Sequence, residues 1–327
     1  MHFQEGIDAQ PEVLAHSAKE VSNALQNVAV PDGPAVLGLV GIGASEHAAR
    51  SAAVAWRQAG LRAFPLSASE PLRGSATLAD VYVALSESGR SAETVQAMRQ
   101  AGGRRLGVTN VAESPLAAVV DELLLMESGP DSPVYTTGYT ATLQTLGLLG
   151  DRWSGQCNDW SIVPELVSGV LRAAPSTIEA VADGFDRARV IDVVGSGVSH
   201  ATVGEGALLL RESARAHTAA HETYNYLHGP MEPLDERTAC IIVGDGREVR
   251  LAGDVSELGC HTLLLTARTD VPRTDRLTVL TLPAVDMPMA RPVLEILPMQ
   301  LLGASLAARR GLAISGFRYH QDDTKLD

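Results

Sequence analysis

The sequence contains few cysteines and few aromatic residues. Three cysteines occur in 327 residues, and none of them has the spacing to another cysteine or to a histidine that a metal site requires. This pattern argues against a disulfide framework and against a zinc site, and we expect no bound metal. We interpret Cys157, Cys240 and Cys260 as small, buried, apolar residues without a functional role.

Basic residues are also scarce. The chain has 26 Lys and Arg residues against 39 Asp and Glu residues, which gives a net charge of −13. No basic run is present that could neutralise a row of phosphates, so we expect neither nucleic acid nor an anionic membrane as a partner. An acidic protein can still bind a phosphorylated small molecule where a local pocket supplies enough hydrogen-bond donors.

Long apolar runs are missing as well. The segment from Val36 to Ala44 is interrupted by glycines and is far shorter than the ~20 residues of a membrane span. The stretch MHFQEGIDAQPEVLAHSAKE lacks a basic region followed by an apolar one, so it does not resemble a signal peptide, and we expect a cytoplasmic protein. The 45% of hydrophobic residues is enough for packed cores, and the length suggests two domains.

The most informative feature present is an internal repeat of three apolar segments. In each half of the chain the three segments occur in the same order, at a separation close to half the chain length. The pairs are VLGLVGIGAS and VIDVVGSGVS, VYVALSESGRS and ACIIVGDGREV, and RRLGVTN and HTLLLTA. Two tandem copies of one α/β unit explain this arrangement.

Helical patterns between these segments predict the fold. They cover Ser45 to Gly60, Ala92 to Ala101 and Gly204 to Ala216, and strands that alternate with helices indicate parallel sheets with right-handed crossovers. We therefore predict two tandem, doubly wound, flavodoxin-like lobes. We place the first lobe at residues 1–160 and the second at 161–327, because polar residues interrupt the apolar pattern from residue 152 onward.

Two further helices are expected outside the repeat. A first helix should cover Gln10 to Val28, with Pro11 at an early helical position. Another should follow the boundary between the lobes, from Ile162 to Ala173.

The loop from Ser86 to Ser91, SESGRS, is a candidate phosphate site. It follows a predicted strand and precedes a predicted helix, and it offers three hydroxyls and several backbone N–H groups. A solvated turn would have the same composition. Ser45, at the same level of the neighbouring strand, supports the phosphate site, and the second copy, GDGR from Gly244, lacks the serines, which suggests one phosphate site per chain.

Neither glycine turn completes the dinucleotide fingerprint G-x-G-x-x-G, because the sixth positions are Glu46 and His200. We therefore expect no nicotinamide cofactor, and nothing else in the sequence indicates another cofactor.

A carboxylate and an imidazole in the second half could carry proton transfer. Glu205 and Glu212 lie seven residues apart on one helix face, and His228 precedes a Gly-Pro turn. A carboxylate can move a proton between adjacent sugar carbons while an imidazole opens the ring, without a metal. Alternatively, Glu212 forms an ion pair with a neighbouring arginine and His228 only caps the turn.

These motifs together resemble a known family. GIGASEHAA, ALSESGRSAET, GVTNVAESPLA, VGSGVSHATVGEGALLLRES and NYLHGPMEPL occur in the order found in tandem sugar isomerase (SIS) domain proteins. The chain is most similar to the isomerase half of the glucosamine-6-phosphate synthases, over nearly its whole length. We expect no counterpart of their glutamine-hydrolysing domain with its N-terminal cysteine, since His2 is the second residue.

The resemblance implies a role for each matching residue. Ser45, Ser86, Ser88 and Ser91 would bind the sugar phosphate, with Glu87 where the family usually has a glutamine. Glu212 matches the proton-shuttling glutamate. His228, sixteen residues later, matches a ring-opening histidine that reaches into the neighbouring subunit's site, so a homodimer is implied.

The chain departs from the family at three lysine positions. Leu209 and Gly138 replace two of them, and an alignment of the C-termini without gaps places Asp322 where the family has a lysine that forms a Schiff base with the sugar. Lys325 stands three residues further on, and it is either a substitute for that lysine or a solvated tail residue.

We predict an enzyme that isomerises a hexose or amino-hexose 6-phosphate, or deaminates or deglycates one, through an enediol or enolamine. The alternative is a non-catalytic sugar-phosphate sensor, which the lost lysines favour and the retained Glu212 and His228 oppose. Transfer of ammonia to a ketose phosphate is a weaker third possibility, because the glutaminase domain is missing.

Overall fold

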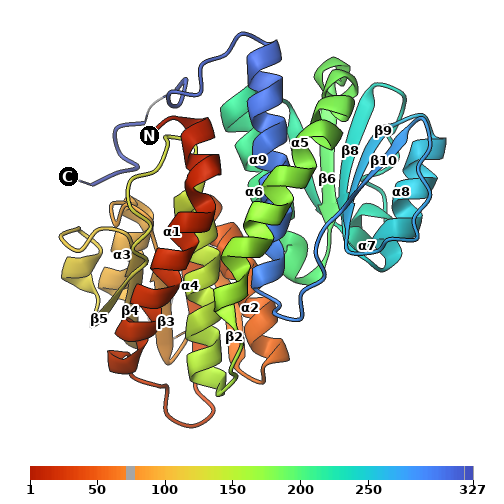
Figure 1. Cartoon of the computed structure of the whole chain (residues 1–327). Helices are drawn as coiled ribbons and strands as arrows, with labels where there is room; N and C mark the ends of the chain where they lie inside the picture. The colour runs from red at the N-terminus through yellow and green to blue at the C-terminus, as the bar shows by residue number, and fades with distance from the viewer. Residues whose placement is uncertain (71–77, 320, 327) are drawn as a thin grey trace.

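The alternating strands and helices form two five-stranded parallel sheets (Figure 1). The computed structural model describes residues 1–70, 78–319 and 321–326. The first sheet has the strand order β2-β1-β3-β4-β5. Its strands are β1 (Val36–Gly41), β2 (Arg62–Ser67), β3 (Val81–Leu85), β4 (Arg104–Thr109) and β5 (Glu122–Leu125).

The second sheet repeats this order as β7-β6-β8-β9-β10. All its neighbouring strands are parallel, like those of the first sheet. Its strands are β6 (Val190–Gly195), β7 (Thr218–Glu222), β8 (Thr238–Val243), β9 (His261–Thr266) and β10 (Leu277–Thr281). The order 2-1-3-4-5 in each sheet is that of flavodoxin-like folds, so the predicted α/β fold class with two doubly wound lobes is confirmed.

Helices pack between and around the two sheets. Figure 1 shows α1, α4, α5 and α9 side by side in the middle of the molecule, with the two sheets on either side. One hydrophobic core runs through both lobes and includes Leu14, Leu146, Val167 and Leu297. The helices are α1 (Phe3–Ala24), α2 (Ala44–Gln58), α3 (Ala92–Gln100), α4 (Thr137–Ser154), α5 (Val163–Arg187), α6 (His200–Ala214), α7 (Thr223–Tyr226), α8 (Arg247–Glu257) and α9 (Ala290–Arg309). The predicted division at residue 160 remains a prediction.

The first helix differs from the prediction because it begins at Phe3 and carries Pro11 in its interior. A proline there has no N–H for the carbonyl four residues earlier, which is that of Ile7. The Gln10 side-chain amide donates to this carbonyl at 3.1 Å and supplies the missing donor. Pro11 therefore does not mark the start of the helix.

Two other expectations need correction. The helix predicted from Ile162 to Ala173 is the start of α5, which continues to Arg187. Cys157 is exposed, whereas Cys240 and Cys260 are buried as predicted. Cys157 lies in the polar connection after α4, where no packed surface covers it.

The C-terminal tail returns from the end of α9 to the first lobe. Ser91 and Lys325 form an antiparallel bridge, the Ala92 N–H donates to the Thr324 carbonyl at 3.1 Å, and the Leu326 N–H donates to the Arg90 carbonyl at 2.8 Å. The tail thus lies along the loop before α3, on the side of the molecule where both chain ends are found (Figure 1).

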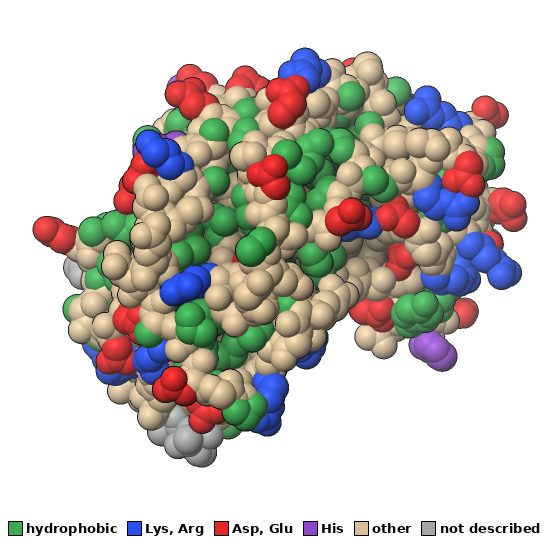
Figure 2. All heavy atoms as spheres, turned by 60° about the horizontal axis from the view of Figure 1, so that its bottom comes forward, with side chains coloured by type: hydrophobic (Ala, Val, Ile, Leu, Met, Phe, Trp, Pro, Cys, Tyr) green, Lys and Arg blue, Asp and Glu red, His purple; other side chains and the backbone are tan. Residues whose placement is uncertain are grey.

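One face of the molecule carries most of its charged groups near the margin (Figure 2). Figure 2 shows hydrophobic side chains gathered over the middle of one face and many acidic and basic side chains at its right-hand end. None of the described helices is both long and apolar enough to cross a membrane. Among the described residues, no group of three or more His, Cys, Asp or Glu side chains is arranged to hold a metal.

Candidate functional site

The serine loop, residues 86–91, lies at the carboxyl edge of the first sheet between β3 and α3. Ser86 is buried, and its hydroxyl donates to the Ser91 hydroxyl at 3.1 Å. Gly89 has a φ of +65°, which allows the loop to turn back so that the Gly89 N–H reaches the Ser86 carbonyl at 2.9 Å. Ser91 is the N-cap residue of α3, so the loop's hydroxyls gather at the positive end of a helix dipole.

Ser45 belongs to the adjacent strand-to-helix turn. Val40 pairs with Ala84, so the ends of β1 and β3 are level. A Cβ on Gly41 would lie 2.7 Å from the Ser45 backbone, so only glycine lets the chain turn this tightly into α2. Ser45 is half-buried in the first turn of α2 and lies at the same sheet edge as the serine loop.

The tail brings Lys325 to the serine loop. Its Nζ lies 3.2 Å from the Ser88 hydroxyl. Although the residue as a whole is exposed, desolvation of the ammonium group and the positive charge of Arg90 lower the pKa of Lys325, against the opposing charge of Glu87. Asp322, at the position of the family's lysine, is exposed and shows no contact with the loop among the described interactions.

Glu87 faces the start of α4. Its carboxylate accepts from the Asn110 side chain at 3.4 Å and lies beside the Tyr135 hydroxyl. Burial and the negative charge of Asp131 raise the pKa of Glu87. Asp131 accepts from the Gly138 N–H at 2.7 Å and so holds the first turn of α4 against the loop.

The crowding around Glu87 explains the missing lysine at position 138. A Cβ on Gly138 would lie 3.0 Å from both the Glu87 side chain and the Asp131 carboxylate. The glycine therefore leaves room for a carboxyl group at position 87 rather than for a cation.

Glu212 approaches this region from the second lobe. It lies near the C-terminal end of α6, is half-buried, and burial raises its pKa to about 7. Its charge contributes to the raised pKa of Tyr135, after the larger effects of burial, Glu87 and Asp131. Tyr135 thus lies between Glu87 of the first lobe and Glu212 of the second.

A cavity of about 410 Å³ opens beside Glu212. It is bounded by the end of α6 and by the tail after α9, and its lining includes three arginines and two aromatic side chains. The lining residues are Arg211, Glu212, Ser213, Arg215, Ala216, His217, Ala313, Gly316, Phe317, Arg318 and Tyr319.

Glu205 lies about two turns before Glu212 on the same face of α6, and it is fully buried. Burial, and to a lesser degree the charge of Glu212, raise the pKa of Glu205 well above its ordinary value. One of its carboxyl oxygens has no hydrogen-bond partner among the described residues. Burial thus favours the protonated form of Glu205, and Glu212 is the member of the pair that borders the cavity.

His228 lies at the other edge of the second sheet. It is exposed and follows the carboxyl end of β7, while Glu212 precedes the amino end of the same strand. A five-residue strand separates the two edges by roughly 16 Å. The structure therefore does not bring His228 and Glu212 of one chain together.

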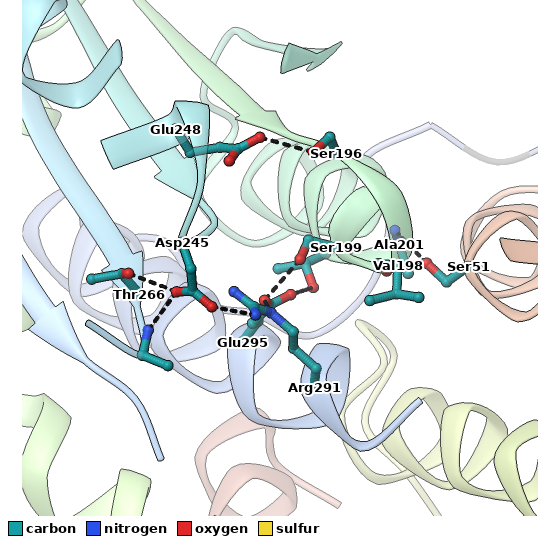
Figure 3. A network of polar contacts seen from close by, with 12 residues as sticks. Ser51, Ser196, Val198, Ser199, Ala201, Asp245, Glu248, Thr266, Arg291 and Glu295 are labelled. Atoms are coloured by element: carbon teal, nitrogen blue, oxygen red, sulfur yellow. Dashed lines mark hydrogen bonds and ion pairs between the residues drawn. The ribbon is translucent and has the colours of Figure 1, made fainter. Parts of the chain in front are cut away.

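The second lobe has no open counterpart of the serine loop. At the matching sheet edge, Asp245 accepts from the Thr266 hydroxyl and the Ala267 N–H, both at 2.7 Å, and forms an ion pair with Arg291 (Figure 3). Arg291 also donates to Glu295 at 2.6 Å. Arg291, a possible donor to an anion at this edge, is thus already paired with two carboxylates.

Sequence reasoning missed Tyr135 and Asp131, which line the site next to Glu87, and the arginines beside Glu212. The segment VYTTGYT contains Gly138 and two tyrosines, Tyr135 and Tyr139. In a chain with 4% aromatic residues, this pair of tyrosines is a signal that points to the segment.

The chain is similar to known proteins of sugar-phosphate metabolism, although no protein-family model matches it. It is 30% identical over 266 residues to a glutamine–fructose-6-phosphate aminotransferase (isomerizing) of Thermus thermophilus, an alignment that covers 74% of this chain and 43% of that protein. The chain thus spans less than half the length of the curated relatives it matches.

Solved structures share the fold over nearly the whole chain. The C-terminal domain of glucosamine-fructose-6-phosphate aminotransferase from Francisella tularensis has a TM-score of 0.85 at 20% identity, with 97% of this chain and 98% of that chain covered. Tagatose-6-phosphate ketose/aldose isomerase from Escherichia coli has a TM-score of 0.81 at 16% identity, with 98% and 97% covered. The chain belongs to the sugar isomerase (SIS) family, as a homologue of the glutamine–fructose-6-phosphate aminotransferases.

Proposed function

We propose that the chain is a sugar-phosphate isomerase or a closely related amino-sugar-phosphate deaminase or deglycase. Its substrate is a hexose or amino-hexose 6-phosphate in the open-chain form. The reaction moves a proton between C1 and C2 through an enediol or, where C2 carries nitrogen, an enolamine. The protein's own side chains suffice for these steps, and the protein acts in the cytoplasm.

The observation that carries this proposal is the environment of Glu212. A carboxylate whose pKa is about 7 is a stronger base than an ordinary glutamate, and about half of it is ionised near neutral pH. It borders a cavity and lies within electrostatic reach of Tyr135, beside the serine loop. Removal of a proton from carbon and its return to the adjacent carbon need such a base.

The serine loop would hold the phosphate. The hydroxyls of Ser45, Ser86, Ser88 and Ser91 and the backbone N–H groups at the start of α3 are donors at a helix N-terminus. An anion fixed there anchors the carbon chain at one end, so that the other end is presented to Glu212.

Lys325 would act at the sugar carbonyl. Its lowered pKa favours the neutral amine that can add to a ketone. Its contact with Ser88 supports Lys325 as the substitute for the lysine missing at position 322, and the amine would have to move from the phosphate loop to the carbonyl of the bound sugar.

His228 would open the sugar ring in the site of a second subunit. Glu212 precedes β7 and His228 follows it, and this separation supports the supply of the two groups by different chains. A homodimer in which each His228 reaches the partner's Glu212 satisfies this geometry.

The test is incubation of the purified chain with hexose 6-phosphates, 2-amino-hexose 6-phosphates and fructosamine 6-phosphates, followed by NMR of the sugar carbons. Conversion of one of these classes by the chain, and not by Glu212→Gln, supports the proposal. Stabilisation by a sugar phosphate without conversion would show that the chain is a sensor and not an enzyme. A ligand at 100 times its Kd adds ~2.7 kcal/mol to the free energy of unfolding without any chemical reaction. No response to any phosphate would refute the serine site.

A further inference from the structure

The cavity beside Glu212 is unusually basic for this acidic protein. Three arginines line it, and the only acidic lining residue is Glu212 itself. Arg215 and Arg318 form no ion pair with any carboxylate among the described residues, although the chain carries 39 acidic residues. Arg211 donates to the Thr218 carbonyl, which is a neutral partner.

Arg215 also has an unfavourable backbone conformation. Its φ of +53° and ψ of +34° place it in the left-handed region at the C-terminal end of α6, where glycine is the residue that fits without strain. A non-glycine residue held in this conformation beside a cavity points to a role for its side chain.

The position of the cavity relates it to the proposed reaction. None of its lining residues belongs to the serine loop, and Glu212 is the residue that both borders the cavity and influences Tyr135 next to that loop. A substrate anchored by its phosphate at the serine loop would therefore present its C1–C2 end, and any substituent there, toward the arginines.

We propose that the substrate carries a carboxylate-bearing substituent at its C1–C2 end, and that Arg215 and Arg318 bind this carboxylate. This inference rests on the proposed function. Guanidinium groups pair with carboxylates through charge-assisted hydrogen bonds, and a cavity of about 410 Å³ has room for an amino-acid-sized group. The exposed rings of Phe317 and Tyr319 on the same lining offer an apolar surface to its carbon atoms.

The test compares two ligands that differ only in charge. One is the 6-phosphate of fructosyl-glycine, and the other is the same compound with the carboxylate converted to an amide. Their Kd values are measured by calorimetry for the full chain, for Arg215→Gly and Arg318→Gln, and for Arg152→Gln as a control at an exposed arginine of α4 outside the cavity.

We expect the unmodified chain and the control to bind the carboxylate at least about tenfold more tightly than the amide. Both cavity variants should lose most of this preference and keep their affinity for the amide. Arg215→Gly should melt at the same or a higher temperature, because glycine relieves the left-handed strain, so a loss of binding in it cannot be ascribed to misfolding.

Equal binding of the two ligands by the unmodified chain would overturn the inference, and so would no binding of either. An equal loss of affinity for both ligands in the variants would place the phosphate, not a carboxylate, in the cavity. A change from dimer to monomer with the preference intact would assign the arginines to a subunit contact. Turnover of sugar phosphates is measured separately, so a missing carboxylate preference with intact turnover removes this inference and leaves the proposed function standing.

Discussion

The Lys325 Nζ lies 3.2 Å from the Ser88 hydroxyl, although the two residues are 237 positions apart in the chain. The contact depends on the tail, which leaves α9 in the second lobe and pairs with residues 90–92 of the first. The tail therefore places an amine at the proposed phosphate loop.

Lys325 should form a covalent adduct that borohydride can trap. The amine adds to the sugar ketone with loss of water, and hydride then reduces the imine to a stable secondary amine. The chain has only two lysines, Lys19 and Lys325, so peptide mass spectrometry can assign the adduct without ambiguity. We expect the mass of a reduced sugar phosphate on the peptide with Lys325.

Lys19 serves as the internal control because its side chain is 75% exposed on α1. Lys325→Met should abolish trapping, and Lys19→Met should leave it unchanged. Equal labelling of the two lysines would show that Lys325 is a solvated tail residue without a role in the reaction.

Replacement of Glu212 by Gln should abolish turnover and stabilise the fold. The amide keeps the shape of the side chain but cannot accept the proton, so we expect kcat to fall by ~10²-fold or more with little change in substrate Kd. The glutamine also removes a carboxyl group that burial makes costly to ionise.

The stability change should depend on pH with a defined sign. The pKa of Glu212 is about 7 in the folded chain, above the ordinary value of 4.5, so the folded state binds the additional proton and wild-type stability falls as the pH rises from about 4.5 to 7. Urea unfolding should show Glu212→Gln more stable by about 1–3 kcal/mol at pH 8 and equal to wild type near pH 4. A variant that is less stable at pH 8 would show that Glu212 is a structural residue.

Much of the first lobe's site could be predicted from the sequence. Glycine and serine mark the strand-to-helix turns locally, so the loop from Ser86 to Ser91 and the start of α3 at Ala92 follow from a few adjacent residues. The repeat of three apolar segments likewise predicted two similar α/β lobes, and the two sheets have the same strand order.

The rest depends on contacts that spacing does not encode. The sixteen residues between Glu212 and His228 contain β7, and only the strand's direction shows that the two side chains lie at opposite edges. Arg291 pairs with Asp245 at the edge of the second sheet that matches the serine loop. It comes from α9, 46 residues after Asp245. The tail's return to the serine loop is a long-range pairing of the same kind.

Glu87→Gln should extend activity to higher pH. Burial and Asp131 raise the pKa of Glu87, which favours the protonated carboxyl, and this form can donate a hydrogen bond as the family's glutamine does. That donor is lost as the pH rises and Glu87 ionises. The ratio of variant to wild-type kcat/KM should therefore increase as the pH rises.

Asn110→Asp tests the same environment from a neighbouring position. Asn110 donates to Glu87, and an aspartate there removes this hydrogen bond and adds a like charge, so the pKa of Glu87 should rise further and activity should be kept to higher pH than in wild type. A pH profile of Glu87→Gln parallel to that of wild type would show that Glu87 stays ionised throughout and has no donor role.

Mixed dimers should reveal whether the site is shared between subunits. Glu212→Gln and His228→Ala should each be inactive as homodimers. In a heterodimer of the two variants, one site combines the intact Glu212 of one subunit with the intact His228 of the other, and the second site has neither. Random reassociation of equal amounts gives half heterodimers, each with one working site, so the mixture should recover about a quarter of the wild-type activity.

The matched control pairs Glu212→Gln with His16→Ala, a change at an exposed histidine on α1 that should leave the homodimer fully active. The Glu212→Gln and His228→Ala variants are mixed in two ways, by unfolding and refolding them together and by simple mixing of the stable dimers. Activity in the first mixture alone would also show that subunit exchange is required. If the mixture of Glu212→Gln and His228→Ala stays inactive while sedimentation shows heterodimers, both residues act within one chain or His228 has no part in the reaction. The separation of the two residues by the length of β7 makes recovery of activity the expected result.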